Sequence, residues 1–394
     1  MHRGLFLPTV ITVSVVLGAC GGPSGGPSGR QAASDVSSAA PSEDDVPRFS
    51  TAGWTTDFSI HSVPFTEIIS GGPGKDGIPA LDASQYERVG DVAWLAASEP
   101  VIAVEINGEA RAYPIQILIW HEIANDTLGD IPIAVTFCPL CHTAIVYDRR
   151  LDGAVQQFGV SGKLRHSDMV MFDRATESWW QQATGEAIVG TLTGSQLEFL
   201  PSQLMGWQQF AGRYPEGTVL SRETGHSRSY GSNPYIGYDD IDTSPFLLDD
   251  VTLLDGRLSP KLRVLAVALG DEAAAYPFPD LAVERVVNDE VGGVPLVILF
   301  WPGVVSGLGG DTVAGGDEVG SAAAFVRQLD DELLDFEPAG DGAMRDRQTG
   351  SAWDFTGLAT DGPLTGRRLE PVAADSPFWF AWAIFRPESR IWQP

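Results

Sequence analysis

Short runs in which apolar and polar residues alternate predict a chain built mainly of strands. Val101–Ile106 and Ala110–Tyr113 flank the dipeptide Asn107-Gly108, which is typical of a two-residue hairpin turn. Ile131–Phe137 alternates in the same way, and the β-branched and aromatic run Thr143–Tyr147 is expected to be its return strand. The segment between these last two runs would then form the tip of a hairpin.

Patterns with helical spacing are few. We expect a short helix over Ile115–Ala124, a turn at Asp126–Asp130, and one further helix over Gln203–Arg213. Later segments alternate short strands with glycine turns. The sequence therefore predicts a strand-rich α+β fold.

The strongest pattern in the chain is an internal repeat. Residues 101–139 align without a gap with residues 264–302 at a constant offset of 163, and 15 of the 39 pairs are identical. The repeat resumes downstream, where Asp173-Arg174 and Trp180 correspond to Asp346-Arg347 and Trp353. We therefore expect two duplicated, pseudo-equivalent lobes, which span residues 47–245 and 246–394.

The second copy lacks the soft metal-binding side chains of the first. At the offset of 163, the positions of Cys138, Cys141, His142 and His121 hold Trp301, Val304, Val305 and Glu284. The second lobe is thus expected to be degenerate, with a mobile glycine-rich loop over residues 303–320. The joint loss suggests that the four side chains of the first copy belong to one site.

Composition and charge exclude some partners. With 43% hydrophobic residues the chain can bury a substantial core. Its 52 acidic and 25 basic side chains give a net charge of −27. Because such a surface repels phosphate groups, we expect no binding to nucleic acid. The sequence names no small-molecule or protein partner.

The N-terminus has the pattern of an export signal. Residues 1–20 combine the basic Arg3 with an apolar run over Leu5–Leu17, and the sequence Leu17-Gly18-Ala19-Cys20 resembles a bacterial lipobox. We expect Cys20 to be lipidated and to anchor the protein to the membrane, facing an extracytoplasmic space. Residues 21–46, rich in Gly, Pro, Ser and Ala, are expected to be a disordered tether.

Three segments carry a family resemblance. Residues 121–149, residues 158–190 and residues 229–240 (SYGSNPYIGYDD) are similar to the bacterial and archaeal family known as domain of unknown function 3179. The family name implies no activity, so function is argued from the residues themselves.

The sequence Cys138-Pro-Leu-Cys141-His142 suits a metal site. Two thiolates on a proline-containing turn can bind one ion, and imidazole can complete a shell of sulfur and nitrogen ligands. His121 joins the set because it is lost together with the cysteines in the second copy. These four residues predict a zinc or copper site.

Two other interpretations of the cysteine pair stay open. Cys138 and Cys141 could be the redox pair of a thiol-disulfide oxidoreductase, or a structural disulfide in a non-catalytic surface protein. The motif C-x-x-C-H is also the signature of c-type haem attachment. We do not expect haem, because the motif lies on a strand-rich hairpin in the middle of the chain.

A polar segment after residue 160 offers candidates for acid-base chemistry. If the protein is an enzyme, which the sequence leaves open, Ser161, Arg165, His166 and Asp168 are its candidate catalytic residues. The same residues are also consistent with an ordinary polar loop.

Overall fold

The computed structural model describes residues 42–248, 250–340 and 342–394. The predicted signal peptide, the lipidation at Cys20 and nearly all of the predicted tether lie outside the described residues. All described residues belong to one compact unit. None of their helices has the length and apolar character needed to cross a membrane.

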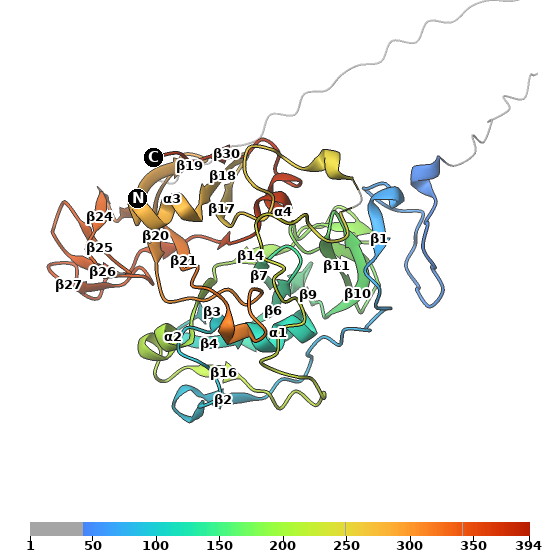
Figure 1. Cartoon of the computed structure of the whole chain (residues 1–394), viewed down its shortest axis with the longest axis horizontal. Coiled ribbons are helices and arrows are strands. Elements are labelled where there is room, and N and C mark those ends of the chain that lie inside the picture. Colours follow the sequence, from blue (N-terminus) through green and yellow to red (C-terminus); the bar gives the residue numbers. More distant parts are fainter. Residues whose placement is uncertain (1–41, 249, 341) are drawn as a thin grey trace, which may run out of the picture. The chain divides into compact units, whose positions relative to one another are not determined.

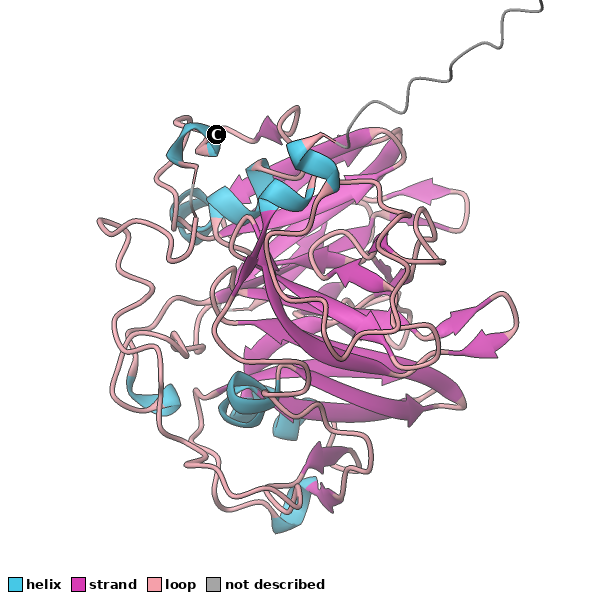
Figure 2. Cartoon of the chain, turned by 90° about the vertical axis from the view of Figure 1, so that its right-hand side faces the viewer, coloured by secondary structure: helices cyan, strands magenta, loops and turns pink. Residues whose placement is uncertain are grey.

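The fold is strand-rich α+β, as the sequence predicts. Strands form several sheets, and the helices between them are short (Figure 2). The hairpin at Asn107-Gly108 is confirmed, with both residues at positive φ (52° and 83°) and Ile106 paired with Glu109 across the turn.

Among the described residues, the first half contains three sheets, a small hairpin and two α-helices, whose arrangement can be followed in Figure 1. Sheet 1 has the strand order β15 (Gln203–Gly206), β3 (Pro100–Ile106), β4 (Glu109–Pro114), β16 (Thr218–Leu220), β2 (Tyr86–Arg88). Sheet 2 has the order β14 (Glu198–Leu200), β7 (Thr143–Asp148), β6 (Ile131–Cys138), β5 (Ile123–Leu128). Sheet 3 has the order β1 (Ile68–Ser70), β10 (Phe158–Arg165), β11 (Asp168–Asp173), β12 (Trp179–Gln181), β13 (Ala187–Val189). The hairpin is β8 (Arg150–Leu151) with β9 (Ala154–Val155), and the helices are α1 (Ile115–His121) and α2 (Trp207–Arg213).

The same order of strands recurs in the second half. Sheet 4 has the order β29 (Ala374–Asp375), β17 (Val264–Leu269), β18 (Glu272–Pro277), β30 (Arg390–Ile391). Sheet 5 has the order β28 (Glu370–Pro371), β21 (Ser321–Val326), β20 (Val294–Trp301), β19 (Val286–Val291). Sheet 6 has the order β24 (Phe336–Pro338), β25 (Ala343–Asp346), β26 (Ala352–Asp354), β27 (Ala359–Asp361). The hairpin is β22 (Gln328–Leu329) with β23 (Glu332–Leu333), and the helices are α3 (Phe278–Glu284) and α4 (Trp379–Ala383).

Three predicted element boundaries are wrong. The helix predicted over Gln203–Arg213 begins only at Trp207, because the preceding residues pair with β3 as strand β15. The helix predicted over Ile115–Ala124 ends at His121, since Glu122 takes a positive φ of 59°. Strand β5 then runs to Leu128, where a turn was expected from Asp126.

The glycine-rich loop over residues 303–320 is packed, in contrast to the mobile loop expected from its composition. Leu308 and Val313 are fully buried in the same hydrophobic cluster as Ile115 of the first half. A second cluster also joins the halves, since it holds Val101 and Trp207 together with Trp301 and Trp353. The two halves therefore share part of their hydrophobic core, while other clusters belong to one half alone.

Candidate functional site

The two cysteines lie on the turn that joins β6 to β7. Cys138 pairs with Thr143 across this turn, and the backbone N–H of Cys141 donates to the carbonyl of Cys138 at 3.3 Å. Both side chains are buried, with Cys138 2% exposed and Cys141 fully covered, and both are free thiols. The predicted hairpin tip is therefore confirmed, although it is covered by other parts of the protein.

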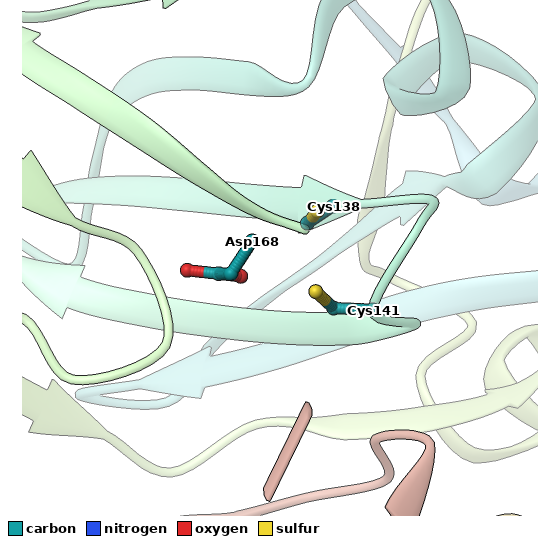
Figure 3. Close-up of side chains that lie close together, drawn as sticks. All are labelled: Cys138, Cys141 and Asp168. Carbon is teal, nitrogen blue, oxygen red and sulfur yellow. The ribbon is translucent and has the colours of Figure 1, made fainter. Parts of the chain in front are cut away.

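Asp168, the first residue of β11, lies in the same cluster as the two cysteines. One ligand atom from each of Cys138, Cys141 and Asp168 can be chosen so that all three lie within 4.8 Å of one another (Figure 3). Asp168 comes from sheet 3, whereas the cysteines come from sheet 2. The site is thus built where the end of the β10–β11 hairpin meets the C-P-L-C turn.

The two oxygens of the Asp168 carboxyl group differ in their hydrogen bonds to the described residues. Its Oδ2 accepts from the side chain of Gln181 at 2.5 Å and from the backbone N–H of Ala183 at 2.9 Å. Its Oδ1 is buried and has no hydrogen-bond partner among the described residues. A buried polar atom without a partner is costly unless it serves a ligand.

Burial disfavours negative charge throughout this site. It raises the pKa of Asp168 to about 6 and the pKa of the Cys141 thiol well above its usual value. Burial, reinforced by the nearby Asp168 carboxylate, also raises the pKa of Glu122 to about 8. Several acidic groups are therefore held together without a cation among the described residues to balance them.

The structure does not bring His121 into the group formed by the cysteines. Its side chain is fully buried, and its two ring nitrogens lie 2.7 Å from the carbonyl oxygen of Pro79 and 2.7 Å from the hydroxyl of Tyr230. Burial lowers the pKa of His121 to about 4, so the ring is neutral at pH 7.

His142 follows Cys141 directly but also stays outside the group. It has a positive φ of 55°, and its Nδ1 lies 2.9 Å from the carbonyl oxygen of Ser376 in the second half. Its ring packs between Phe137 and Phe378. Burial lowers its pKa well below the usual value, so that His142 acts as a neutral contact between the halves.

The four candidate catalytic residues do not form one cluster. The Ser161 hydroxyl donates to the carbonyl of Val170 within the β10–β11 hairpin. Arg165 and His166 both contact Glu67, at 2.7 Å and 3.2 Å. Only Asp168 lies beside the cysteines, where its geometry suits a ligand.

Two aromatic residues of the segment 229–240 cover the cysteine turn. The hydroxyl of Tyr238 donates to the carbonyl of Leu140 at 3.0 Å and accepts from the backbone N–H of Phe246 at 3.1 Å. Tyr235 packs against the same hydrophobic cluster as Cys138.

Glu122 is not among the site residues predicted from the sequence, although the repeat shows a difference in charge at its position. The position 163 residues later is Arg285, which reverses the charge at a site where both residues follow a short helix with positive φ. Such a charge reversal indicates a change in the chemistry of the site rather than in the backbone.

Comparison with known proteins gives a family and no activity. A family model described as "Protein of unknown function (DUF3179)" matches residues 75–389. No curated protein and no solved structure matches the chain. Since the matched region covers most of the sequence, including all residues of the site, the chain belongs to the DUF3179 family of proteins of unknown function.

Proposed function

We propose that the first half of this protein binds a transition metal ion, zinc or copper, through Cys138, Cys141 and Asp168. The observation that carries this proposal is the clustering of three potential ligand atoms within 4.8 Å, one of them on a buried carboxyl group whose Oδ1 has no hydrogen-bond partner among the described residues. Two thiolates and a carboxylate form a donor set that zinc accepts, and thiolates also bind copper.

The electrostatics of the site support a cation. Burial raises the pKa values of Asp168 and Cys141, so their charged forms are unfavourable in the metal-free protein. A bound metal ion would stabilise these same charged forms and release protons on binding. Three protein ligands would leave a fourth position for water, a substrate or the nearby Glu122.

The oxidoreductase alternative has less support. Reactive cysteines in such enzymes have lowered pKa values, commonly because they lie at a helix N-terminus. Here burial raises the pKa of Cys141, and the residues after the motif form strand β7. These features disfavour a thiolate that is exposed and ready to react.

Metal analysis of protein purified without chelator or reductant tests the proposal. We expect about one ion per chain, and a loss of most of it in Cys138→Ser and in Asp168→Asn. His121→Ala serves as the matched control and should retain the metal, because both ring nitrogens of His121 contact other groups. Metal-free protein whose thiols react rapidly and reversibly with a disulfide reagent would instead favour the oxidoreductase.

We also propose that the protein is a lipoprotein held on the outer side of a bacterial cell membrane. The lipobox-like sequence Leu17-Gly18-Ala19-Cys20 supports this proposal. Mass spectrometry of the mature N-terminus should find a lipid-modified Cys20, and an unmodified N-terminus would contradict it.

We infer further that the two halves descend from one duplicated unit. The ungapped repeat and the recurring strand order support this inference. Each half also contains one parallel strand pair at the same position of its sheet. The pair is β4 with β16 in sheet 1 and β18 with β30 in sheet 4.

A further inference from the structure

Two cavities lie between the strands of the two halves, and each is lined by residues from both. The first, here called the Glu105 cavity, has a volume of about 260 Å³ and includes Glu105, Tyr214 and Arg368 in its lining. The second, here called the Arg386 cavity, has a volume of about 230 Å³ and includes Ala268 and Arg386.

The linings of the two cavities share several positions that the repeat relates to one another. Glu105 on β3 and Ala268 on β17 are separated by the repeat offset of 163. Helices α2 and α4 begin at Trp207 and Trp379, which are 172 residues apart, and the same offset relates Tyr214 to Arg386. The two cavities therefore occupy corresponding places in the two halves. Their side chains can be compared at the related positions.

In the Glu105 cavity the polar groups satisfy one another. Arg368 donates to the Glu105 carboxylate at 2.7 Å, and the hydroxyl of Tyr214 donates to the same oxygen at 2.8 Å. Glu105 and Arg368 thereby neutralise each other without a ligand, and the one other acidic residue of this lining is Asp375, which lines both cavities.

In the Arg386 cavity the corresponding carboxylate is missing. Ala268 occupies the position of Glu105, and the guanidinium group of Arg386 makes one hydrogen bond, to the backbone carbonyl of Phe385 at 3.3 Å. No carboxylate of the described residues lies within 4.0 Å of it. This half-buried cation thus has no carboxylate partner within salt-bridge distance, although it also lines a neighbouring cavity together with Asp271, Glu272 and Glu388.

The remaining walls of the Arg386 cavity are mainly apolar. They are formed by Ile145, Val146, Phe199, Trp382 and Phe385. Asp375 is the one acidic residue of the lining, and its Oδ1 already accepts from the backbone N–H groups of Ala144 and Ser376. Burial raises the pKa of Asp375 to about 7, so this carboxyl group carries only part of a full negative charge near neutral pH. A cation among mainly apolar walls matches a ligand that has one negative charge and an apolar body.

We propose that the Arg386 cavity binds a small organic monoanion, such as an aromatic or short aliphatic carboxylate, with its charge on Arg386 and its apolar body against Phe199 and Trp382. This site is separate from the proposed metal centre. The two adjoin through Ala183, which lines the cavity while its backbone N–H donates to Asp168 at 2.9 Å. None of the three proposed metal ligands lines the cavity.

Calorimetric titration with benzoate, phenylacetate and hexanoate tests this proposal, with benzamide as the uncharged counterpart of benzoate. We expect at least one of the carboxylates to bind with a Kd below about 1 mM, and benzoate to bind more tightly than benzamide. Arg386→Gln should weaken carboxylate binding by about tenfold or more and abolish the preference over benzamide.

Two further variants exploit the correspondence between the cavities. Ala268→Glu supplies the carboxylate that Glu105 provides in the other cavity, so it should also weaken binding. Arg368→Gln removes the cation of the Glu105 cavity and should leave carboxylate binding unchanged. The unfolding temperature of each variant separates a loss of binding from a loss of fold.

The proposal is overturned if none of the three carboxylates binds at concentrations up to about 10 mM. It is equally overturned if Arg386→Gln binds as the unchanged protein does, or if Arg368→Gln weakens binding as much as Arg386→Gln. None of these measurements depends on the proposed metal ligands. The carboxylate-binding result can therefore be interpreted even if the protein binds no metal.

Discussion

At the scale of single residues, unusual backbone angles surround the proposed metal site. His142, His166 and Ser167 all have positive φ values, between 54° and 68°. Non-glycine residues in this region cost about 1 kcal/mol or more, and such strain tends to persist where function requires it. In the second half, the turn between β24 and β25 instead has positive φ values at Gly340 and Gly342.

The burial of His121 gives a pH prediction. Its folded pKa of about 4 lies below the ordinary histidine value of 6.5, so the unfolded chain binds more protons between these pH values. The free energy of unfolding should therefore decrease as the pH falls from about 6.5 towards 4, by on the order of 1 to 2 kcal/mol between pH 7 and pH 5.

Chemical denaturation of the protein and of His121→Gln at both pH values measures this effect. The variant should lose less stability on acidification. His226→Gln, at an exposed ring 5.3 Å from His121, is the control and should keep most of the dependence. Equal pH dependence in the protein and in His121→Gln would contradict the assignment of His121 as a buried neutral group.

The sequence identifies the cysteine pair, but it does not determine which other side chains lie beside that pair. The cysteine pair is identified by its spacing, which determines that both thiols lie on one turn. The repeat groups His121 and His142 with this pair, because all four positions hold other residues in the second copy. A shared loss does not reveal side-chain direction, and the structure shows His121 bonded to Pro79 and Tyr230 instead.

At the scale of elements, one longer hairpin distinguishes the half with the site. Strand β10 has 8 residues, whereas its counterpart β24 has 3. The additional length carries Asp168 and the carbonyl of Ser167 to the thiols, with that carbonyl 3.4 Å from the sulfur of Cys141. In the second half the position of Cys138 is filled by the buried indole of Trp301.

The packed loop at residues 303–320 leads to a second prediction. Leu308 is fully buried and belongs to the core cluster that includes Ile115 of the first half. Leu308→Ala should therefore lower the free energy of unfolding by about 2 to 5 kcal/mol, as expected for a core leucine. Denaturant titration measures the change, with Val251→Ala at an exposed position as the control.

A change below about 0.5 kcal/mol in Leu308→Ala would indicate that the loop is mobile, as its composition suggested. Composition could not reveal the packing, because the partners of this loop lie in the other half of the chain. A distant partner also explains the misassigned residues 203–206, because the strand β3 with which they pair lies about 100 residues earlier in the chain, although within the same half.

At the scale of the whole molecule, the two halves depend on a shared core. Hydrophobic residues of both halves belong to common clusters, and the backbone N–H of Phe378 donates to the carbonyl of Cys141 at 2.9 Å. The recurrence of strand order could be expected from the repeat in the sequence. The contacts between the halves could not be expected from the sequence, because side chains that pack between the two copies leave no periodic pattern in it.

This shared core predicts one cooperative transition for residues 47–394. Thermal unfolding monitored by circular dichroism and by tryptophan fluorescence should give coincident curves. A fragment of residues 246–394, produced alone, should fail to fold because it would expose the apolar surface of Trp301 and Trp353 that packs with the first half. Two separate transitions, or a folded fragment, would instead show that the halves are independent domains.

The central claim is that a metal ion lies between two cysteines and an aspartate of the first half. X-ray absorption spectroscopy at the metal edge tests it most directly, on protein as purified and on Cys138→Ser. We predict two sulfur scatterers at about 2.3 Å together with oxygen or nitrogen ligands, and one sulfur fewer or no metal in the variant. A metal shell without sulfur, or one that is identical in Cys138→Ser, would contradict the claim.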